Sequence, residues 1–555
     1  MQAREKLAAV RKAFINHAIA GYLQPVHDEY MSEYPPAAFQ RVAWLSGFSG
    51  SAGMAVVLAD KAALFVDGRY TLQAASEIDA SCFSIYNSAE VTAEAWLAGE
   101  LQGAMIGYDP ALFTKAMLER MQARCDKSGV ALVACPNLVD AVWADQPAPP
   151  ATPVFLHDDA LAGESAASKC ERLGKRITEQ GVDAAFISAP ESVCWLLNIR
   201  ARDVECTPLA LVRAVLHGDG HVDLFIDPKR LPPLPEHITA IHPPSLARLN
   251  GKAVLCDATQ MPVALLDELK SAGARIVKGE DPCVLPKACK NPVQLAGIRA
   301  AHRRDGVAVS KLLKWIDAHP DIHSVSEMDI DRQLLSFRKE QNMFIEPSFP
   351  TIAGSGANGA IVHYRANEKT NRNLKSGELL LLDSGGQYED GTTDITRTIA
   401  IGTPTAEHKD RFTRVLKGHI ALATVQFPKG TRGSQLDSLA RQYLWQVGLD
   451  YDHGTGHGVG QFLGVHEGPQ RISKRGGDAA LEIGMILSNE PGYYKVGAYG
   501  IRIENLVEVV EKGEGFLGFE TITCVPIDTK LVDFSLLSSE EKHWLEEYNA
   551  RASLL

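Results

Sequence analysis

The sequence predicts a mixed α/β protein in which two related α/β domains precede a larger α+β domain. Three observations support this fold class. The chain has 555 residues, more than one hydrophobic core usually organises, and its 45% apolar and 22% charged residues are ordinary for a globular protein. A proline-rich stretch at 146–153 has the composition of a linker. Near Pro286 the pattern of apolar residues changes.

The first two domains are expected at residues 1–150 and 151–286, because a weak repeat occurs on the two sides of the proline-rich stretch. Each half contains an apolar run, a Trp-Leu pair and a second apolar run that ends at an aspartate. These segments lie at 20–23, 44–45 and 65–67, and again at 184–187, 195–196 and 225–227. The spacing is unequal, so two interpretations stay open: related domains with different loops, or chance.

The third domain is expected at residues 287–555. A long amphipathic helix should begin at Asn291-Pro292, because apolar residues recur at helical spacing as far as Ile316. From Leu379 the pattern becomes that of strands separated by Gly-rich turns. The expected strands are 379–382, 395–401, 485–488 and 501–510. Residues 540–547 suit a terminal amphipathic helix.

Charge and composition restrict the function. The formal net charge of -12 and the lack of a basic block oppose binding to nucleic acid or to an anionic membrane. No stretch reaches the roughly 18 apolar residues of a membrane span, and the first residues do not resemble a signal peptide. Ten scattered cysteines are typical of thiols in a reducing compartment. We therefore expect a cytoplasmic protein without nucleic-acid or membrane partners.

Two aspartates mark the start of the candidate site. Asp383 and Asp394 lie in apolar segments joined by a Gly-rich loop, which predicts an antiparallel hairpin. If the hairpin is centred on Tyr388 and Glu389, the two aspartates face each other with Cβ atoms about 5 Å apart. Facing carboxylates repel each other, and two metal ions about 3.5 to 4 Å apart would relieve that repulsion. For this hairpin alone, a solvated turn with incidental acids is the alternative.

A glycine-rich segment carries three histidines, His453, His457 and His466, within 14 residues. The glycines exclude a regular helix, so the imidazoles should be presented by a loop or a strand edge. An imidazole can bind a metal ion or donate a hydrogen bond to a developing oxyanion. Three histidines in this setting favour a functional site over isolated core residues.

Two glutamates complete the candidate set. Glu490 follows an apolar strand just before a Pro-Gly turn, and alternation places Glu504 on the same strand face as Arg502. A buried glutamate is costly unless it is paired or bound to metal, and Arg502 could hold a neighbouring liganding carboxylate in place. This oxygen-rich set suits manganese, cobalt or similar ions better than a structural zinc site. Its members are Asp383, Asp394, His457, Glu490 and Glu504.

These motifs resemble a known family. The segments LLDSG, GTTDITRT, HGTGHGVG, SNEPGYY and GIRIEN occur in the order typical of pita-bread-fold metallopeptidases. SGSAG and DGRY near the start extend the similarity over nearly the whole chain. Within that fold the chain is similar to the three-domain X-Pro aminopeptidases, also called aminopeptidase P. The resemblance implies two creatinase-like domains, a pita-bread catalytic domain with a C-terminal extension, and a homodimer.

The resemblance also implies roles for single residues. One metal ion would be bound by Asp383, a bridge would be formed by Asp394 and Glu504, and the second metal site would be completed by His457 and Glu490. The cofactor would be two divalent ions, Mn²⁺ first, with Co²⁺ or Zn²⁺ as alternatives. The implied catalytic residues are Glu490, His466, His363 and His453. The implied substrate contacts are His363, His453, His466, Arg502 and, from the first domain, Arg69.

The predicted function is a metal-dependent aminopeptidase that releases the first residue from peptides with proline in second position. A hydroxide bridging the two ions would attack the carbonyl before proline, while Glu490 takes and returns the proton. His466 and His363 would stabilise the tetrahedral oxyanion. The preference for proline rests on the resemblance, because the sequence shows no pocket for the ring.

Two alternatives remain open. The first is an Xaa-Pro dipeptidase, or prolidase, of the same fold, which would act only on dipeptides. The second is a metal-binding interaction protein without catalytic activity. The presence of His363, His453 and His466 beside an intact ligand set disfavours the second alternative.

Overall fold

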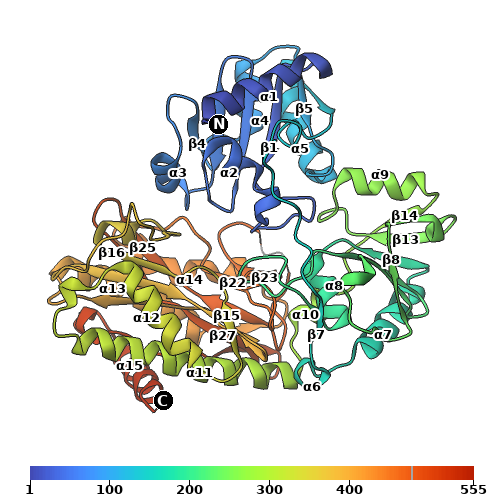
Figure 1. Ribbon diagram of the computed structural model, residues 1–555. Coiled ribbons are helices and arrows are strands. Elements are labelled where there is room, and N and C mark those ends of the chain that lie inside the picture. The colour runs from blue at the N-terminus through green and yellow to red at the C-terminus, as the bar shows by residue number, and fades with distance from the viewer. Residues whose placement is uncertain (477–478, 555) are drawn as a thin grey trace. The chain divides into compact units, whose positions relative to one another are not determined.

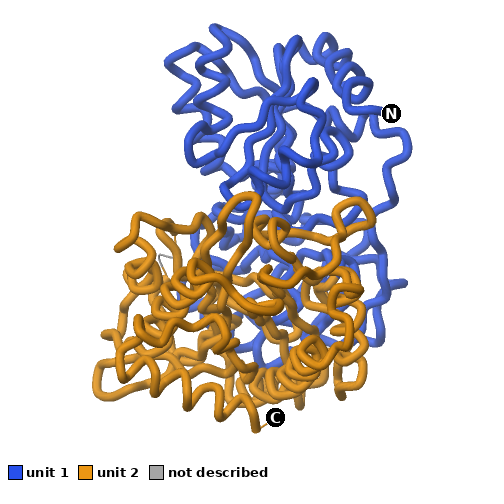
Figure 2. The backbone as a smooth tube through the Cα atoms, turned by 90° about the vertical axis from the view of Figure 1, so that its left-hand side faces the viewer, with its two compact units in different colours: residues 1–156, 165–205, 209–283 blue, residues 157–164, 206–208, 284–555 orange. Residues whose placement is uncertain are grey.

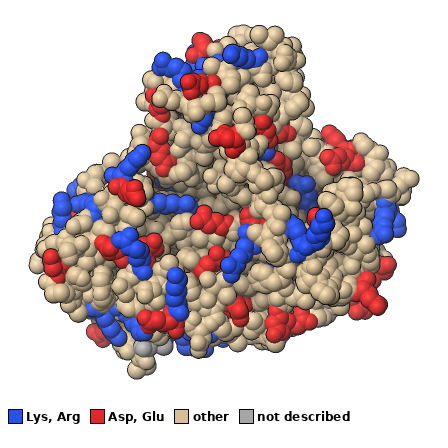
Figure 3. Space-filling model, viewed as in Figure 1, with Lys and Arg blue, Asp and Glu red and all other residues tan. Residues whose placement is uncertain are grey.

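The chain forms two compact units in this computed structural model, which describes residues 1–476 and 479–554 (Figure 1). Unit 1 comprises residues 1–156, 165–205 and 209–283, and unit 2 comprises 157–164, 206–208 and 284–555 (Figure 2). Among the described residues, no helix is both long and apolar enough to span a bilayer. On the face shown in Figure 3, acidic and basic side chains are interspersed rather than gathered into a field of one sign.

Unit 1 contains two six-stranded sheets of the same topology, ordered β4-β3-β2-β1-β5-β6 and β12-β11-β10-β8-β13-β14. In each sheet a central strand, β1 or β8, pairs antiparallel with one neighbour and parallel with the other. The matching order confirms the prediction of two related α/β domains. The strands of the first sheet are β1 (Gly21–Pro25), β2 (Gly53–Leu58), β3 (Ala62–Val66), β4 (Ser84–Asn87), β5 (Met105–Tyr108) and β6 (Ala131–Ala134). Those of the second are β8 (Ala184–Ile187), β10 (Arg213–His217), β11 (Val222–Phe225), β12 (Ile238–Ile241), β13 (Ala253–Cys256) and β14 (Arg275–Lys278).

Three helices of unit 1, namely α4, α5 and α7, begin at a side chain that satisfies a free backbone N–H group. Thr92, Thr114 and Ser165 each accept a hydrogen bond from a backbone N–H of the first helical turn. The helices are α1 (Ala3–His17), α2 (Arg41–Ser46), α3 (Thr71–Glu77), α4 (Ala93–Glu100), α5 (Lys115–Cys125), α7 (Ala166–Glu179), α8 (Pro190–Leu197) and α9 (Val263–Ser271).

Unit 2 is an α+β unit whose strands form several antiparallel sheets. Its helices are α6 (Asp159–Ala162), α10 (Val284–Ala288), α11 (Pro292–Ala318), α12 (Glu327–Lys339), α13 (Ala406–Thr424), α14 (Gly433–Trp445) and α15 (Ser539–Ala552). Its strands are β15 (Phe344–Pro347), β16 (Ile352–Ser355), β17 (Leu379–Ser384), β18 (Gly386–Tyr388), β19 (Gly391–Thr392), β20 (Ile395–Ala400), β21 (Gln426–Pro428), β22 (Gly456–Gly458), β23 (Glu467–Ile472), β24 (Ile486–Asn489), β25 (Gly492–Lys495), β26 (Tyr499–Arg502), β27 (Asn505–Gly513) and β28 (Phe516–Thr521).

The predicted long helix and the predicted terminal helix are both confirmed. α11 begins with a capping box between Asn291 and Gln294 and has proline at its first position, where the missing N–H costs nothing. α15 begins with a capping box between Ser538 and Glu541. Local sequence therefore determines where both helices start.

The sheet β16-β17-β20 separates a packed apolar face from the face that carries the candidate site. Leu380 and Leu382 of β17 pack in one core cluster with residues of α11 and α12. Asp383 is the next residue, so strand alternation turns its side chain to the opposite face. The helices thus bury one face of the sheet, and the opposite face receives the acidic residues.

The predicted hairpin is confirmed, but the expected register is wrong by two residues. Asp383 pairs with Thr396 rather than with Asp394, and the hairpin is centred between Glu389 and Asp390. The reason is the turn, which lies between Tyr388 and Gly391. Since Asp394 and Thr396 are two residues apart, Asp394 still lies on the same face as Asp383, as a diagonal neighbour.

The predicted strand 501–510 is divided at Glu504. β26 ends at Arg502 and pairs with β25, whereas β27 begins at Asn505 and pairs with β24. Between them the backbone N–H of Glu504 donates to the carbonyl of Thr396 in β20, at 3.1 Å. The chain therefore changes sheets at Glu504, which brings this carboxylate to the site face of β20.

A buried ion pair connects the helices to the hairpin. Arg338 of α12 donates to both carboxylate oxygens of Asp305 in α11, at 2.7 and 3.1 Å, and both side chains are almost fully buried. Asp305 also accepts hydrogen bonds from Tyr388 and Thr393 of the hairpin. Burial opposes ionisation of Asp305, but Arg338 and the two hydroxyls hold its pKa below the ordinary value.

Replacing Arg338 with methionine should lower the free energy of unfolding by about 3 to 5 kcal/mol, because Asp305 would be left buried without a counter-ion. Urea denaturation followed by tryptophan fluorescence measures this loss. The control is Arg332→Met, since the pair of Arg332 with Asp329 is exposed and its loss should cost about 1 kcal/mol or less. Equal stability of the two variants would contradict the structural role of the buried pair.

Candidate metal centre

Three predicted ligands converge on the site face of β20. Donor atoms of Asp394, His457 and Glu504 all lie within 4.8 Å of one another. Asp394 directly precedes β20, and Thr396, two residues later on the same face, donates from Oγ1 to Glu504 Oε2 at 2.7 Å. The strand thus supplies one carboxylate and orients a second.

His457 presents a ring nitrogen to the carboxylates. It lies in β22, and its Nδ1 is 3.0 Å from the carbonyl oxygen of Gly458, which can only accept a hydrogen bond. Nδ1 therefore carries the proton, and the lone pair of Nε2 is available as a ligand. Nε2 lies 3.4 Å from Asp394 Oδ2 and 3.5 Å from Glu490 Oε1.

Glu490 is held at the end of β24. Its backbone N–H donates to the carbonyl of Thr455 at 2.8 Å, which ties the end of the strand to the histidine segment. Ser488 donates from its hydroxyl to Glu490 Oε1 at 3.0 Å. The other oxygen, Oε2, lies 4.0 Å from Nδ1 of His453.

Arg502 connects Asp383 to His453 through a tyrosine. The guanidinium of Arg502 donates to Asp383 Oδ2 at 2.6 Å and to the hydroxyl of Tyr494 at 2.5 Å. The Tyr494 hydroxyl lies 2.8 Å from Nε2 of His453, whose Nδ1 is 2.8 Å from the carbonyl of Gly454. Since Nδ1 must donate to that carbonyl, Nε2 accepts from Tyr494.

The electrostatics of this cluster fit positive ions. Burial and the negative charges of Asp383 and Glu490 raise the pKa of Asp394 well above its ordinary value. Burial and the neighbouring carboxylates likewise raise the pKa of Glu504 well above its ordinary value. Oδ1 of Asp383 and Oδ1 of Asp394 are buried and have no hydrogen-bond partner. Hard divalent cations would satisfy these oxygens and neutralise the repelling charges.

Three further predicted site residues, His466, His363 and Arg69, have different neighbours. The His466 ring lies 4.3 Å from the His457 ring, centroid to centroid, in an edge-on arrangement. His363 is half-buried and follows Val362, whose carbonyl accepts a hydrogen bond from Arg502 at 3.4 Å. Arg69 belongs to unit 1, where it pairs with Asp67 at 2.7 Å and lies against the Tyr70 ring. His466 is thus in contact with the cluster, and the role of Arg69 stays a prediction.

Two residues of the cluster had no predicted role. Thr396 is fully buried and contacts both Glu504 and Arg502. Strand alternation after Asp394 could have indicated it, since residues two apart share a face. Tyr494 contacts Arg502 and His453 through its hydroxyl. No local pattern distinguishes it from the adjacent Tyr493, because its role depends on contacts between distant segments.

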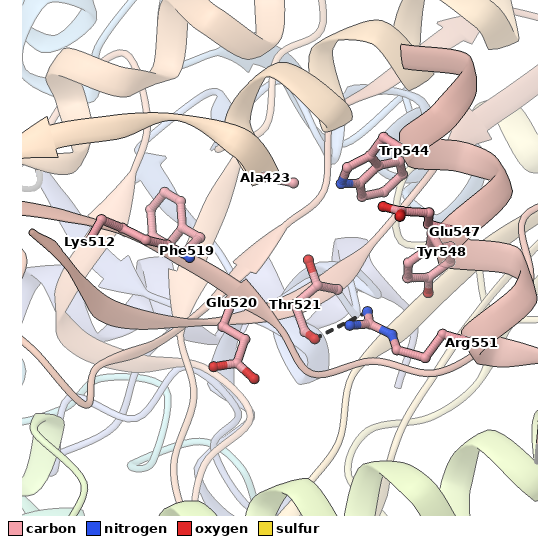
Figure 4. A pocket seen from close by; sticks show the side chains of 9 residues that line it. All are labelled: Ala423, Lys512, Phe519, Glu520, Thr521, Trp544, Glu547, Tyr548 and Arg551. Carbon is pink, nitrogen blue, oxygen red and sulfur yellow. Dashed lines mark hydrogen bonds between the residues drawn. The ribbon is translucent and has the colours of Figure 1, made fainter. Parts of the chain in front are cut away.

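A surface pocket of about 380 Å³ lies elsewhere in unit 2 (Figure 4). It contains none of the predicted site residues. Its lining includes aromatic side chains of α15 and charged groups of both signs, which specify no ligand class. The lining residues are Ala423, Lys512, Phe519, Glu520, Thr521, Trp544, Glu547, Tyr548 and Arg551.

The stabilisation of the protein by Mn²⁺ should depend on pH. The raised carboxyl pKa values mean that the metal-free folded state binds more protons than the unfolded chain, so its stability falls as pH rises above about 4. Bound divalent ions remove this penalty and compete with protons for the same oxygens. The increase in melting temperature on adding Mn²⁺ should therefore be larger at about pH 8 than at about pH 5. Differential scanning calorimetry measures the melting temperature. Equal increases at both pH values would contradict the binding of Mn²⁺ by these carboxylates.

Models of four protein families or family domains together match most of the chain. "Metallopeptidase family M24" matches residues 296–511, and "C-terminal region of peptidase M24" matches residues 515–553. "Creatinase/Prolidase N-terminal domain" matches twice, at residues 7–142 and 145–294. The double match agrees with the repeated sheet topology of unit 1.

Two relatives align over nearly the whole chain. Aminopeptidase P2 of Arabidopsis thaliana is 39% identical over 98% of this chain and 85% of its own length. A probable Xaa-Pro aminopeptidase P of Laccaria bicolor is 39% identical over 98% of this chain and 89% of its own length.

Among solved structures, the X-prolyl aminopeptidase of Caenorhabditis elegans, described as a cytosolic enzyme with a di-nuclear active site, has a TM-score of 0.93. It is 34% identical, and the alignment covers 100% of this chain and 95% of that one. The prolidase of Pyrococcus horikoshii has a TM-score of 0.52 and 23% identity, over 65% of this chain and 99% of its own. That second similarity concerns the fold alone.

Proposed function

The chain belongs to the Xaa-Pro aminopeptidase family of metallopeptidases, and from that premise we propose that it releases the first residue from peptides with proline in second position. It is a hydrolase of the M24 fold that takes divalent metal ions. The observation that carries the proposal is the convergence of donor atoms from the buried Asp394 and Glu504 and the half-buried His457. A cluster of this kind is stable only when cations or protons balance its charge.

The proposed ligands divide between two ions. One ion would contact Asp383, and the other would contact His457 and Glu490, with Asp394 and Glu504 shared between them. When bound, two such ions activate water as a nucleophile near neutral pH. Mn²⁺ is the proposed metal, with Co²⁺ or Zn²⁺ as alternatives, because the donors are mainly carboxylate oxygens.

Glu490 is the proposed proton carrier. Its Oε1 is anchored by the Ser488 hydroxyl, whereas its Oε2 has His453 Nδ1 4.0 Å away. A carboxylate held in this way can accept a proton from the attacking water and return it to the leaving proline nitrogen. The leaving nitrogen must be protonated, because an amide anion is a very poor leaving group.

The histidines outside the ligand set are proposed to contact the substrate. His466, edge-on to His457, and His363, next to the carbonyl that Arg502 holds, would donate hydrogen bonds to the oxyanion that forms on the scissile carbonyl. Arg502 would hold the carboxylate of Asp383 in place through their 2.6 Å ion pair. His453 is supported by Tyr494, so its ring has a fixed tautomer and orientation.

The aminopeptidase is favoured over the two alternatives. A prolidase shares the fold, but the solved prolidase structure is 23% identical, compared with 39% for relatives named aminopeptidase P. An interaction protein without activity would have no need of Glu490, His453 and His466 around the same ligands. The substrate N-terminal amine would lie against the ions, which restricts cleavage to the first bond.

Kinetics on two matched peptides test the proposal. An Xaa-Pro tripeptide should lose its first residue, whereas the same peptide with alanine in second position should be cleaved more slowly. Chelation should abolish the activity and added Mn²⁺ should restore it, because the proposed mechanism has no nucleophile without the ions. Liquid chromatography of the products measures both. Hydrolysis of Xaa-Pro dipeptides alone would instead indicate a prolidase.

The remaining proposals concern the whole protein. We propose three domains divided at residues 150 and 286, a homodimer, and a substrate contact from Arg69 of the first domain. The boundaries rest on the proline-rich stretch and the change of pattern near Pro286, whereas the homodimer and the Arg69 contact follow from the family resemblance. We propose a cytoplasmic location because the related Caenorhabditis elegans enzyme is described as cytosolic.

Two histidine variants should separate metal binding from transition-state stabilisation. His466→Ala should lower kcat about a hundredfold or more with little change in metal content, since the loss of one oxyanion donor costs about 3 kcal/mol. His457→Ala should lower metal content as well as kcat, because a ligand is lost. Elemental analysis after dialysis, combined with peptide kinetics, measures both. Loss of metal from His466→Ala but not from His457→Ala would contradict the division of roles.

A further inference from the structure

Two proposed metal ligands lie just outside one pair of strands. Asn489 of β24 and Asn505 of β27 are direct partners across the ladder. Glu490 follows the first of these residues and Glu504 precedes the second. The spacing between the two carboxylates therefore depends on how firmly the ends of β24 and β27 are held together.

His419 of α13 bridges these two strand ends. This histidine is fully buried, its Nδ1 lies 3.1 Å from the carbonyl oxygen of Asn489, and its Nε2 lies 3.1 Å from the side-chain nitrogen of Asn505. In addition, the side-chain amide of Asn489 donates to the backbone carbonyl of His419 at 2.9 Å. One side chain of a helix thus touches the residues next to both glutamates.

The hydrogen bonds fix the state of the imidazole. The Asn489 carbonyl only accepts, so Nδ1 of His419 carries the proton, and the Asn505 amide donates to the lone pair of Nε2. Burial and the nearby charge of Arg397 lower the pKa of His419 to about 3. The ring is therefore neutral, as this pattern of donors and acceptors requires.

Asn505 is fixed from its other side as well. Its Oδ1 accepts from Arg397 at 2.8 Å and from the hydroxyl of Tyr548 at 3.0 Å. Arg397 also donates to the carbonyls of Glu504 and Thr396, at 2.6 and 2.7 Å. Arg397 therefore holds the backbone of one proposed ligand and the side chain that follows it.

The C-terminal helix supplies the last member of this set. Tyr548 belongs to α15, and its hydroxyl accepts from Arg397 at 2.7 Å and can donate to Asn505 Oδ1 at 3.0 Å or to the carbonyl of Val525 at 2.9 Å. The ring of Trp544 stacks on Tyr548 and meets the ring of His419 edge-on. Both aromatic residues of α15 also line the pocket in Figure 4. We call the set of His419, Asn505, Arg397 and Tyr548 the His419 network.

We propose that the His419 network positions the carboxylates of Glu490 and Glu504 and so sets the affinity of the protein for its metal ions. This inference rests on the proposed function, because it assumes that both glutamates bind metal. None of the four side chains is itself a proposed ligand. They act through the backbone or side-chain neighbours of the ligands, and changes in such supporting groups typically weaken metal binding about 10- to 100-fold.

Tyr548→Phe is the mildest test, because it removes only the hydroxyl that joins α15 to Asn505 and Arg397. The dissociation constant for Mn²⁺, measured by titration calorimetry on the dialysed full-length protein, should rise about tenfold or more. Tyr499→Phe is the matched control, since Tyr499 is also buried but its hydroxyl donates to Glu407. This control should leave the dissociation constant unchanged.

A second pair of variants tests the histidine. His419→Leu should weaken Mn²⁺ binding at least as much as Tyr548→Phe, and His419→Asn should restore part of the affinity, because its amide can donate to the Asn489 carbonyl. The matched control is His302→Leu, since His302 is equally buried but bonds only to Ile298 of its own helix. The melting temperature of each metal-free variant is measured alongside.

Three outcomes are distinguishable. Weaker Mn²⁺ binding by the network variants than by their controls supports the proposal. Lower melting temperatures with unchanged Mn²⁺ affinity would overturn it, because the network would then serve folding alone. If the wild-type protein itself bound no Mn²⁺, the proposed function would fail before any variant was compared.

Discussion

Four carboxylates and one imidazole are collected at the interior end of several strands, and their mutual repulsion is the constraint on which the rest of the site depends. Asp394 and Glu504 are buried beside Asp383 and Glu490, which raises the pKa of both acids. Protons can relieve the repulsion at low pH, but near neutrality divalent cations relieve it better, since each ion can contact several oxygens at once. A cluster that is unfavourable by itself becomes a binding site.

Three of the four carboxylates are held in place by a hydrogen-bond donor on a strand. Arg502 holds Asp383, Thr396 holds Glu504, and Ser488 holds Glu490. Each of these donors comes from a strand, which positions side chains more rigidly than a loop does. The helices α11 and α12 bury the face of the β16-β17-β20 sheet that does not carry the acidic residues. The apolar core and the charged site therefore lie on opposite faces of this sheet.

Much of this could be predicted from the sequence, because the signals were local. Leu379 to Leu382 is a continuous apolar run that ends at the charge of Asp383, Asn291-Pro292 opens a helix, and the glycines around His457 exclude one. The position of Glu504 was predicted within a continuous strand, whereas the chain changes sheets there. The backbone N–H of Glu504 donates to the carbonyl of Thr396, which lies more than a hundred residues earlier in the chain. No local sequence pattern indicates a contact between such distant residues.

The same limit applies to the supporting residues. Asp383 and Asp394 were expected to face each other, but turn geometry moved the register by two residues and made them diagonal neighbours. The sequence predicts no role for Tyr494 or His419. The local sequence around a tyrosine in a strand or a histidine in a helix does not show whether the residue supports a site or packs in a core. Their significance lies in the partners of their polar atoms, which only the folded chain brings together.

Two metal ions are expected in this cluster, and anomalous diffraction from crystals grown with Mn²⁺ would locate them. We expect two peaks about 3.5 to 4 Å apart, both in contact with Asp394 and Glu504, one also next to Asp383 and the other next to His457. A single peak, or peaks away from these side chains, would contradict this expectation.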